Sequence, residues 1–188
     1  MPETADDNYK MAETINEVKF SDAGMAEIQR YISHYPEGRQ KSAILPIMHV
    51  AQAEFGGWLS PQAMDKIAEI LNIQPIEVYE VATFYTMFNL KPVGKHVLEV
   101  CRTGPCCLRG ADQMIDMIKE KLNIEEGETT ADGMFTLKPV ECLASCGTGP
   151  MLQVRETFYE SIDSEEKLDQ FLETMRNTEV ETPYHQAQ

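Results

Sequence analysis

Two short stretches carry every cysteine of the chain: CRTGPCC at residues 101–107 and ECLASCG at residues 141–147. Each contains a pair at metal-ligand spacing, C-x4-C for Cys101 and Cys106 and C-x3-C for Cys142 and Cys146. Four thiolates delivered by two loops make a tetrahedral sulfur environment, which suits either Zn²⁺ or an iron–sulfur cluster. Buried thiols acting as small hydrophobes are the alternative. That alternative accounts less well for a chain with no cysteine elsewhere.

The segments around these stretches predict a small sheet. Residues 96–100 alternate as a β-strand and run into Cys101, and residues 134–137 form a second strand that leads towards Cys142. Residues 151–154 and 157–159 are typical of a β-hairpin.

Helices are expected to cover this sheet. One is predicted from about Pro105 to Leu122, with Leu108 facing inward, and the last begins at Asp163, where Glu166 completes a capping box. The order strand, helix, strand, hairpin, helix favours a sheet with helices packed on it.

The first half of the chain has a helical period instead. Helices are predicted at 23–34 with Asp22 as the cap, from Ser42, from Pro61 with Ser60 as the cap, and from Pro75 to Phe88. The last of these is apolar on nearly all sides, so it needs cover on more than one side. It is either the central helix of a bundle, or its aromatic end also faces the second domain or a partner; that end comprises Phe84, Tyr85, Met87 and Phe88.

These patterns predict an α+β chain: a flexible acidic arm at 1–22, a four-helix bundle at 23–94, a cysteine-bearing domain at 95–176 and a polar tail at 177–188. The bundle and the cysteine-bearing domain meet at the segment KPVGK, residues 91–95.

Composition limits the partners. The net charge of −15 argues against nucleic acid and anionic lipid as partners, and favours docking onto other proteins. No apolar run approaches the roughly 20 residues that span a bilayer. The N-terminus lacks a signal core and the basic character of a transit peptide, so we expect a reducing cytoplasm, where clustered cysteines bind metal.

An ordered set of motifs resembles one family. It comprises the run VYEVATFYTMF at 78–88, then KPVG at 91–94, then Val100-Cys101 and Pro105-Cys106, then Glu141-Cys142-Leu143 with Cys146. Gly57-Trp58 with Ser60 also matches. The resemblance is to the [2Fe–2S] subunit in the NADH-oxidising arm of respiratory NADH:quinone oxidoreductase, complex I.

This resemblance implies a thioredoxin-like ferredoxin domain behind the helical bundle. It implies one [2Fe–2S] cluster held by Cys101, Cys106, Cys142 and Cys146. It also implies a partner flavoprotein subunit that binds FMN and NADH, with further peripheral-arm subunits beyond it. The chain would then lie in the cytoplasm on the inner face of the membrane, or on the matrix side in a processed eukaryotic chain. The same module serves NAD-linked formate dehydrogenases and hydrogenases, which the sequence does not exclude.

Three positions, Ala144, Pro150 and Cys107, bear on the predicted cluster site. The family usually has glycine where this chain has Ala144, and alanine accepts a positive φ less readily. Pro150 matches a proline that is often cis in thioredoxin-like folds. Cys107 is an extra thiol; helical neighbours diverge by about 100°, so it cannot face a metal together with Cys106 and is expected to be a bystander.

The cysteines and their neighbours also indicate, without the resemblance, which kind of iron–sulfur cluster would fit. A [2Fe–2S] core has two irons that each need two thiolates, so two pairs from two loops suit it. Rieske ligation needs histidines near the cysteines, and His96 lies too far back along a strand. Arg102 either offsets the negative charge of a cluster or is simply solvated.

Electron counting separates the roles of the subunits. NADH gives up two electrons at once, whereas such a cluster takes one, and the chain has no G-x-G-x-x-G or P-loop of its own. A flavin on another subunit must therefore split the pair. We expect an electron-transfer subunit of an oxidoreductase with no catalysis when isolated. The rivals are a structural Zn(Cys)4 interaction module and a thiol–disulfide enzyme, although the latter would need a C-x-x-C that is absent.

Overall fold

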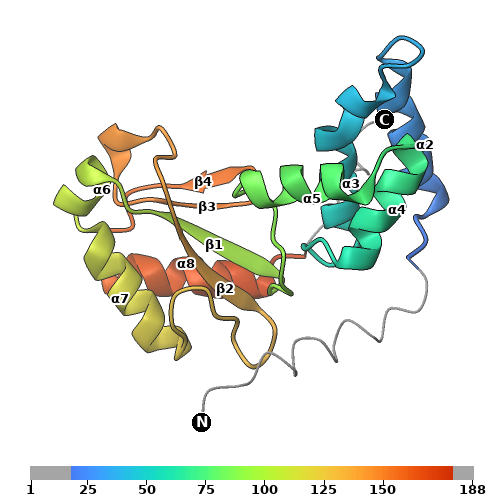
Figure 1. Cartoon of the computed structure of the whole chain (residues 1–188). Helices are drawn as coiled ribbons and strands as arrows, with labels where there is room; N and C mark the ends of the chain where they lie inside the picture. Colours follow the sequence, from blue (N-terminus) through green and yellow to red (C-terminus); the bar gives the residue numbers. More distant parts are fainter. Residues whose placement is uncertain (1–17, 180–188) are drawn as a thin grey trace. The chain divides into compact units, whose positions relative to one another are not determined.

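The computed structural model describes residues 18–179, and the chain divides after Pro92 into two compact units (Figure 1). Most of the predicted arm at 1–22 and of the tail at 177–188 lies outside the described residues. In the described part, Phe20 is buried and Ser21 caps a helix, so the arm does not extend to residue 22 as predicted.

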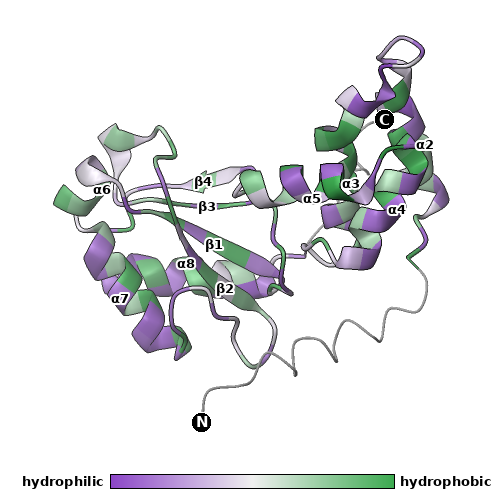
Figure 2. Cartoon of the chain, viewed as in Figure 1, coloured by the Kyte–Doolittle hydropathy of each residue, from purple (hydrophilic) through white to green (hydrophobic). Residues whose placement is uncertain are grey.

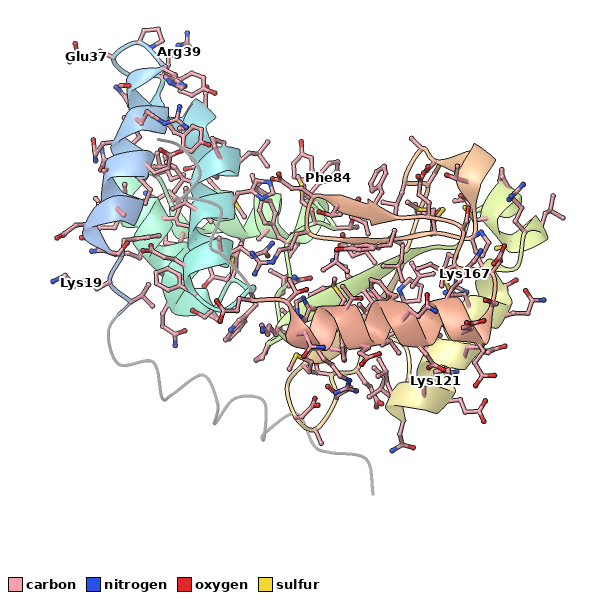
Figure 3. The ribbon with its side chains drawn as sticks, turned by 180° about the vertical axis from the view of Figure 1, so that it is seen from behind. Lys19, Glu37, Arg39, Phe84, Lys121 and Lys167 are labelled. Atoms are coloured by element: carbon pink, nitrogen blue, oxygen red, sulfur yellow. The ribbon has the colours of Figure 1, made fainter. Side chains whose placement is uncertain are left out.

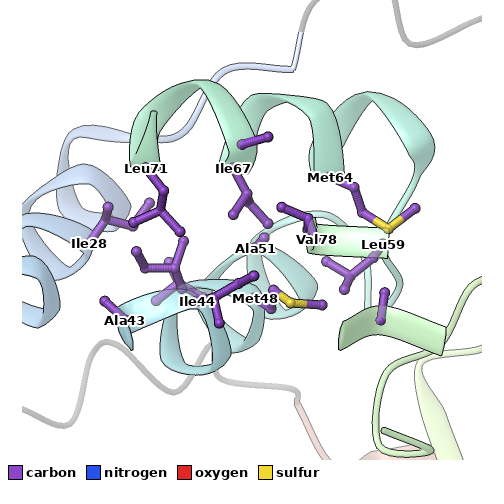
Figure 4. Close-up of a cluster of buried hydrophobic side chains, with 14 of the residues drawn as sticks. Ile28, Ala43, Ile44, Met48, Ala51, Leu59, Met64, Ile67, Leu71 and Val78 are labelled. Carbon is purple, nitrogen blue, oxygen red and sulfur yellow. The ribbon is translucent and has the colours of Figure 1, made fainter. Parts of the chain in front are cut away.

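The first unit is built from helices. They are α2 (Asp22–Ser33), the 3₁₀ turn η1 (Gln40–Ala43), α3 (Ile44–Glu54), α4 (Pro61–Leu71) and α5 (Pro75–Phe84). The α-helices pack in chain order, α2 on α3, α3 on α4 and α4 on α5. They share one apolar core (Figure 4), whose fully buried members include Ile28, Ile47, Met48, Leu59 and Ile67.

Two helix starts test the capping predictions. Ser60 caps α4 as predicted, because its hydroxyl accepts a hydrogen bond from the amide of Ala63 at 3.1 Å, and Pro61 stands at the first helical position. The cap predicted for α2 was wrong. Ser21 accepts from the amide of Gly24 at 3.0 Å, and Asp22 is the first helical residue.

Helix α5 ends earlier than predicted. Tyr85 is already extended, so the helix stops at Phe84. This turn brings Phe88 into the core, where 5% of it is exposed and its ring lies 5.0 Å from that of His49. Phe84 remains outside with 77% of its surface exposed (Figure 3). Burial of one large ring outweighs one further turn of helix, which adds little in exposed positions.

The second unit contains one four-stranded sheet. Its strands are β1 (His96–Cys101), β2 (Phe135–Val140), β3 (Leu152–Val154) and β4 (Thr157–Tyr159), in the order β2-β1-β3-β4. Strands β1 and β2 are parallel, and the other two pairings are antiparallel. All four strands start within two residues of their predicted positions, because their alternating pattern is local.

The predicted helix at 105–122 is two helices, α6 (Gly104–Leu108) and α7 (Ala111–Leu122). Gly110 separates them with φ of 104°, a conformation that glycine adopts without steric cost. The break turns Leu108 outward, with 91% of it exposed, so the prediction that it faces inward was wrong. Figure 2 shows hydrophobic and hydrophilic residues alternating along α7, which buries its apolar side.

The last helix, α8 (Glu165–Asn177), lies beside α7. Ser164 caps it rather than the predicted Asp163. Lys121 of α7 joins Glu165 and Asp169 of α8, each at 2.8 Å (Figure 3). The core between the sheet and the two helices contains Leu98, Met114, Ile118, Phe135, Leu137, Leu152 and Leu168.

The described chain is therefore α+β, with mixed helices and one four-stranded sheet. None of the helices within residues 18–179 has the length and apolar character needed to span a bilayer.

Candidate metal centre

The sheet brings the two cysteine stretches to the same edge. Cys101, the last residue of β1, is paired with Val140, the last residue of the parallel strand β2. The amide of Arg102 donates to the carbonyl of Val140 at 3.0 Å, so the pairing continues past the strand ends. Cys142 follows two residues later. Parallel neighbouring strands end at one edge of a sheet, and here both ends lead into cysteines.

The first pair is buried, with 1% of Cys101 and 1% of Cys106 exposed. Thr103 organises the turn between them, because its carbonyl accepts from the amides of Cys106 at 2.9 Å and Cys107 at 3.0 Å. The Thr103 hydroxyl lies 3.3 Å from the sulfur of Cys101. Cys101 and Cys106 belong to the same small buried cluster, together with Ala111 and Met151.

The second pair is exposed. The sulfurs of Cys142 and Cys146 are 4.0 Å apart, and Cys146 begins the short 3₁₀ turn η2 (Cys146–Thr148). The amide of Ala144 donates to the sulfur of Cys142 at 3.3 Å. An amide directed at a sulfur stabilises negative charge there, as ligands of metal clusters require.

The pKa of a thiol in the first pair is affected by the charges of the second pair. Burial raises the pKa of the Cys101 thiol, but hydrogen bonds from Thr103 and from the amide of Leu143 in the second stretch outweigh this and lower it. Burial, followed by the Cys101 thiol and the charges of the second pair, raises the pKa of Cys106 to about 11. The pKa of Cys146 is raised chiefly by Cys142. Negative charge on the second pair thus disfavours ionisation of Cys106, and a bound cationic centre would relieve that repulsion.

A glycine leaves room beside the buried pair. A Cβ placed on Gly149 would lie 3.1 Å from the sulfur of Cys106, so only hydrogen fits there without displacement. The carbonyl of Gly149 accepts from Nε of Arg109 at 2.6 Å, which ties this segment to the end of α6. The peptide bond from Gly149 to Pro150 is cis, as the resemblance implied.

Three other residues that the sequence analysis considered near the cluster are Cys107, Arg102 and His96. The Cys107 sulfur donates to the carbonyl of Arg102 at 3.2 Å and lies 3.6 Å from a carboxylate oxygen of Asp112. Arg102 forms an ion pair with Glu126 at 3.0 Å, so the structure does not show it facing the cysteines. His96 lies at the other end of β1 from Cys101, and burial lowers its pKa. It is distant from the thiols, as expected.

The donor set can be tested against the two metal alternatives. Within residues 18–179, no three or more cysteine, histidine, aspartate or glutamate side chains are gathered closely enough to hold a single metal ion. The thiols form two pairs instead, one on each loop, and the loops are linked because Leu143 packs against the buried cluster that contains Cys101 and Cys106. Two thiolates for each of two irons is what a [2Fe–2S] core takes, so the residues fit that group in kind, number and pairing.

Some residues around this site were not found from the sequence. Ser145 and Thr148, on either side of Cys146, both hydrogen-bond to Glu160, which follows β4. No local pattern predicts such a contact, because 12 and 15 residues separate the partners along the chain. The missing side chain of Gly149 makes space for the sulfur of Cys106, a close approach between residues that are distant along the chain.

A mixed four-stranded sheet with two helices packed on it and paired thiols at one edge defines the class of thioredoxin-like ferredoxins. The chain belongs to the thioredoxin-like [2Fe–2S] ferredoxin family, whose model matches residues 28–176. Members of this family carry one [2Fe–2S] cluster, and the paired thiols of this chain suit it.

Named relatives agree with the family. Over 145 residues the chain is 43% identical to NADH dehydrogenase [ubiquinone] flavoprotein 2, mitochondrial, of Dictyostelium discoideum, covering 77% of this chain and 59% of that protein. Over 163 residues it is 41% identical to a subunit of the NADH-quinone oxidoreductase of Rickettsia bellii, covering 87% of this chain and 97% of that one. The fold resembles a crystal structure of NAD⁺-reducing [NiFe]-hydrogenase with a TM-score of 0.62 at 16% identity, over 77% of this chain and 24% of that chain.

One backbone position gives a stability prediction. Ala144 has φ of 62°, in the left-handed region that costs alanine roughly 1–2 kcal/mol. Glycine removes this cost but gains entropy in the unfolded chain. We therefore expect Ala144→Gly to raise the free energy of unfolding by about 0.5–1 kcal/mol in urea denaturation of the apoprotein.

The matched control is Ala131→Gly, at an exposed turn position of the same unit without a positive φ. It should lower the free energy of unfolding by about 0.4–1 kcal/mol, because only the unfolded-state term changes. Equal effects of the two substitutions would contradict a strained Ala144.

Proposed function

We propose that Cys101, Cys106, Cys142 and Cys146 hold the [2Fe–2S] cluster, with two thiolates for each iron. The observation that carries the assignment is the parallel pairing of β1 with β2, whose ends lead both cysteine stretches to one edge of the sheet. When bound, the cluster supplies one-electron transfer. The amide of Ala144 donates to the sulfur of Cys142, and such a bond stabilises the added charge after reduction.

The chain is further proposed to be one subunit of a larger enzyme. We propose an electron-transfer subunit of NADH:quinone oxidoreductase that accepts single electrons from the FMN of a flavoprotein subunit. The names of the relatives support this, and so does the absence of a nucleotide-binding fingerprint from the sequence. The isolated chain is then not catalytic. The equivalent subunit of an NAD-linked formate dehydrogenase or hydrogenase is the alternative, supported in fold by the hydrogenase structure.

Each part of the chain has its own role in this proposed subunit. Residues 23–94 serve as a four-helix bundle and residues 95–176 as the cluster domain, with the arm and tail outside them. As part of the complex, the chain lies peripherally on the cytoplasmic or matrix side, and it reaches the membrane only through other subunits.

Metal and sulfide analysis tests the cluster assignment. Protein produced in iron-rich medium at low oxygen should be red-brown and contain two irons and two acid-labile sulfides per chain, because two thiolate pairs complete two iron sites. Dithionite should bleach it and give an EPR signal from one unpaired electron. A colourless protein that holds one zinc tightly would support the Zn(Cys)4 alternative and refute this one.

A further inference from the structure

A carboxylate ties down the loop that carries the exposed cysteine pair. Glu160 lies directly after β4, and one of its oxygens accepts hydrogen bonds from the hydroxyls of Ser145 and Thr148. The two hydroxyl oxygens are 2.7 Å apart, so the three side chains form a closed cluster. When ionised, a carboxylate only accepts, and it can therefore take both hydroxyl protons.

The backbone next to Glu160 strengthens this tie. The amide of Ser161 donates to the carbonyl of Thr148 at 2.8 Å, and the Ser161 hydroxyl reaches the same carbonyl at 3.2 Å. The amide of Ile162 donates to the carbonyl of Pro150 at 3.1 Å. The segment 160–162 thus runs along the residues that follow Cys146 and fixes their path.

The loop needs such a tie. Cys142 and Cys146 are exposed, and η2 spans only three residues without a side-chain cap at Ser145. Ser145 precedes Cys146 and Thr148 follows it by two residues, so Glu160 holds the chain on both sides of that sulfur. Hydrogen bonds from Ser145 and then Thr148 lower the pKa of Glu160, which keeps the carboxylate ionised at neutral pH.

We propose that Glu160 is a positioning residue for the [2Fe–2S] cluster: through Ser145 and Thr148 it fixes Cys146, and its charge lowers the reduction potential. This inference rests on the proposed ligands. Partners that orient metal ligands commonly change metal affinity 10- to 100-fold when removed. Glu160 contacts residues on both sides of Cys146, and a fixed negative charge beside a proposed ligand opposes the arrival of an electron, because reduction adds negative charge.

The test uses the full-length chain loaded with its cluster. Glu160→Ala removes both the bonds and the charge, whereas Glu160→Gln removes the charge and keeps an acceptor. Iron release to a chelator should be about 10- to 100-fold faster in Glu160→Ala and less affected in Glu160→Gln. Both variants should have a higher reduction potential in a dye-mediated titration, and Glu160→Ala should show altered EPR g values. Glu156→Gln is the matched control, because Glu156 is exposed in the turn between β3 and β4 and should change none of these readouts.

A further comparison tests whether Glu160 acts through Ser145 and Thr148. In the double variant Ser145→Ala/Thr148→Val, adding Glu160→Ala should not accelerate iron release further, because the bonds it would break are already absent. Full additivity would overturn the proposal. So would a lower melting temperature of Glu160→Ala with unchanged potential and EPR spectrum, since that would be a purely structural effect. A wild-type chain that binds no cluster would refute the proposed function instead.

Discussion

Serine in place of any of Cys101, Cys106, Cys142 or Cys146 is expected to abolish the cluster or shift its visible and EPR spectra strongly. A hard hydroxyl oxygen replaces a soft thiolate, and iron in such clusters prefers sulfur. Cys142→Ser and Cys146→Ser are the cleanest variants, because both side chains are exposed and serine fits without repacking. Iron and sulfide analysis with EPR after dithionite reduction measures the result.

Cys107→Ser is the matched control, one residue from Cys106. Its sulfur contacts the carbonyl of Arg102 and the carboxylate of Asp112, and a serine hydroxyl can donate to either acceptor. The cluster spectrum should stay nearly unchanged, with a cost in stability below about 1 kcal/mol. Loss of the cluster in Cys107→Ser together with its retention in Cys106→Ser would show that the ligand assignment is wrong.

The second large effect concerns the reduction of the cluster by NADH. The isolated holoprotein should neither bind NADH nor be reduced by it, because hydride transfer delivers two electrons and a [2Fe–2S] cluster takes one. Adding the purified flavoprotein subunit should give a heterodimer and reduction by NADH, with a share of electrons set by the potential of the cluster. Size-exclusion chromatography combined with an anaerobic NADH titration measures both. Reduction of the lone chain by NADH would refute the accessory role.

Phe84 is the proposed anchor for this partner. The residue is 77% exposed, and its ring lies edge to face with that of Tyr85 with centroids 5.0 Å apart, so its removal should cost the free chain little. Buried aromatic anchors commonly contribute about 2 kcal/mol or more, so Phe84→Ala should weaken the heterodimer roughly 30-fold or more. Ile76→Ala, at the exposed start of the same helix, is the control for loss of apolar surface alone. Equal affinities of Phe84→Ala and wild type would show that Phe84 is not the anchor.

Local patterns predicted most of the elements. Alternation located β1 and β2, and Ser60 before Pro61 located the start of α4, because these signals depend on neighbours within a few residues. The helix caps Ser21 and Ser164 were each missed by one residue, since more than one polar residue near the start can supply the accepting oxygen. The confinement of all five cysteines to two stretches was sufficient to predict a metal centre.

The sequence by itself determined that the chain carries a thiolate metal site and that its fold is α+β, because ligand chemistry and the periods of strands and helices depend on short spacings. The choice of a [2Fe–2S] cluster came from the resemblance of the ordered motifs to a known family. Only the tertiary structure decided the end of α5, where burial of Phe88 overrides helical continuity, and the outward turn of Leu108 beside the break at Gly110. It also decided that Cys101 pairs in register with Val140, so that both cysteine stretches begin at one edge of the sheet, and that Glu160 reaches Ser145 and Thr148. These contacts join residues that are distant along the chain, and their geometry is set by how strands align and cores pack, which no local spacing records.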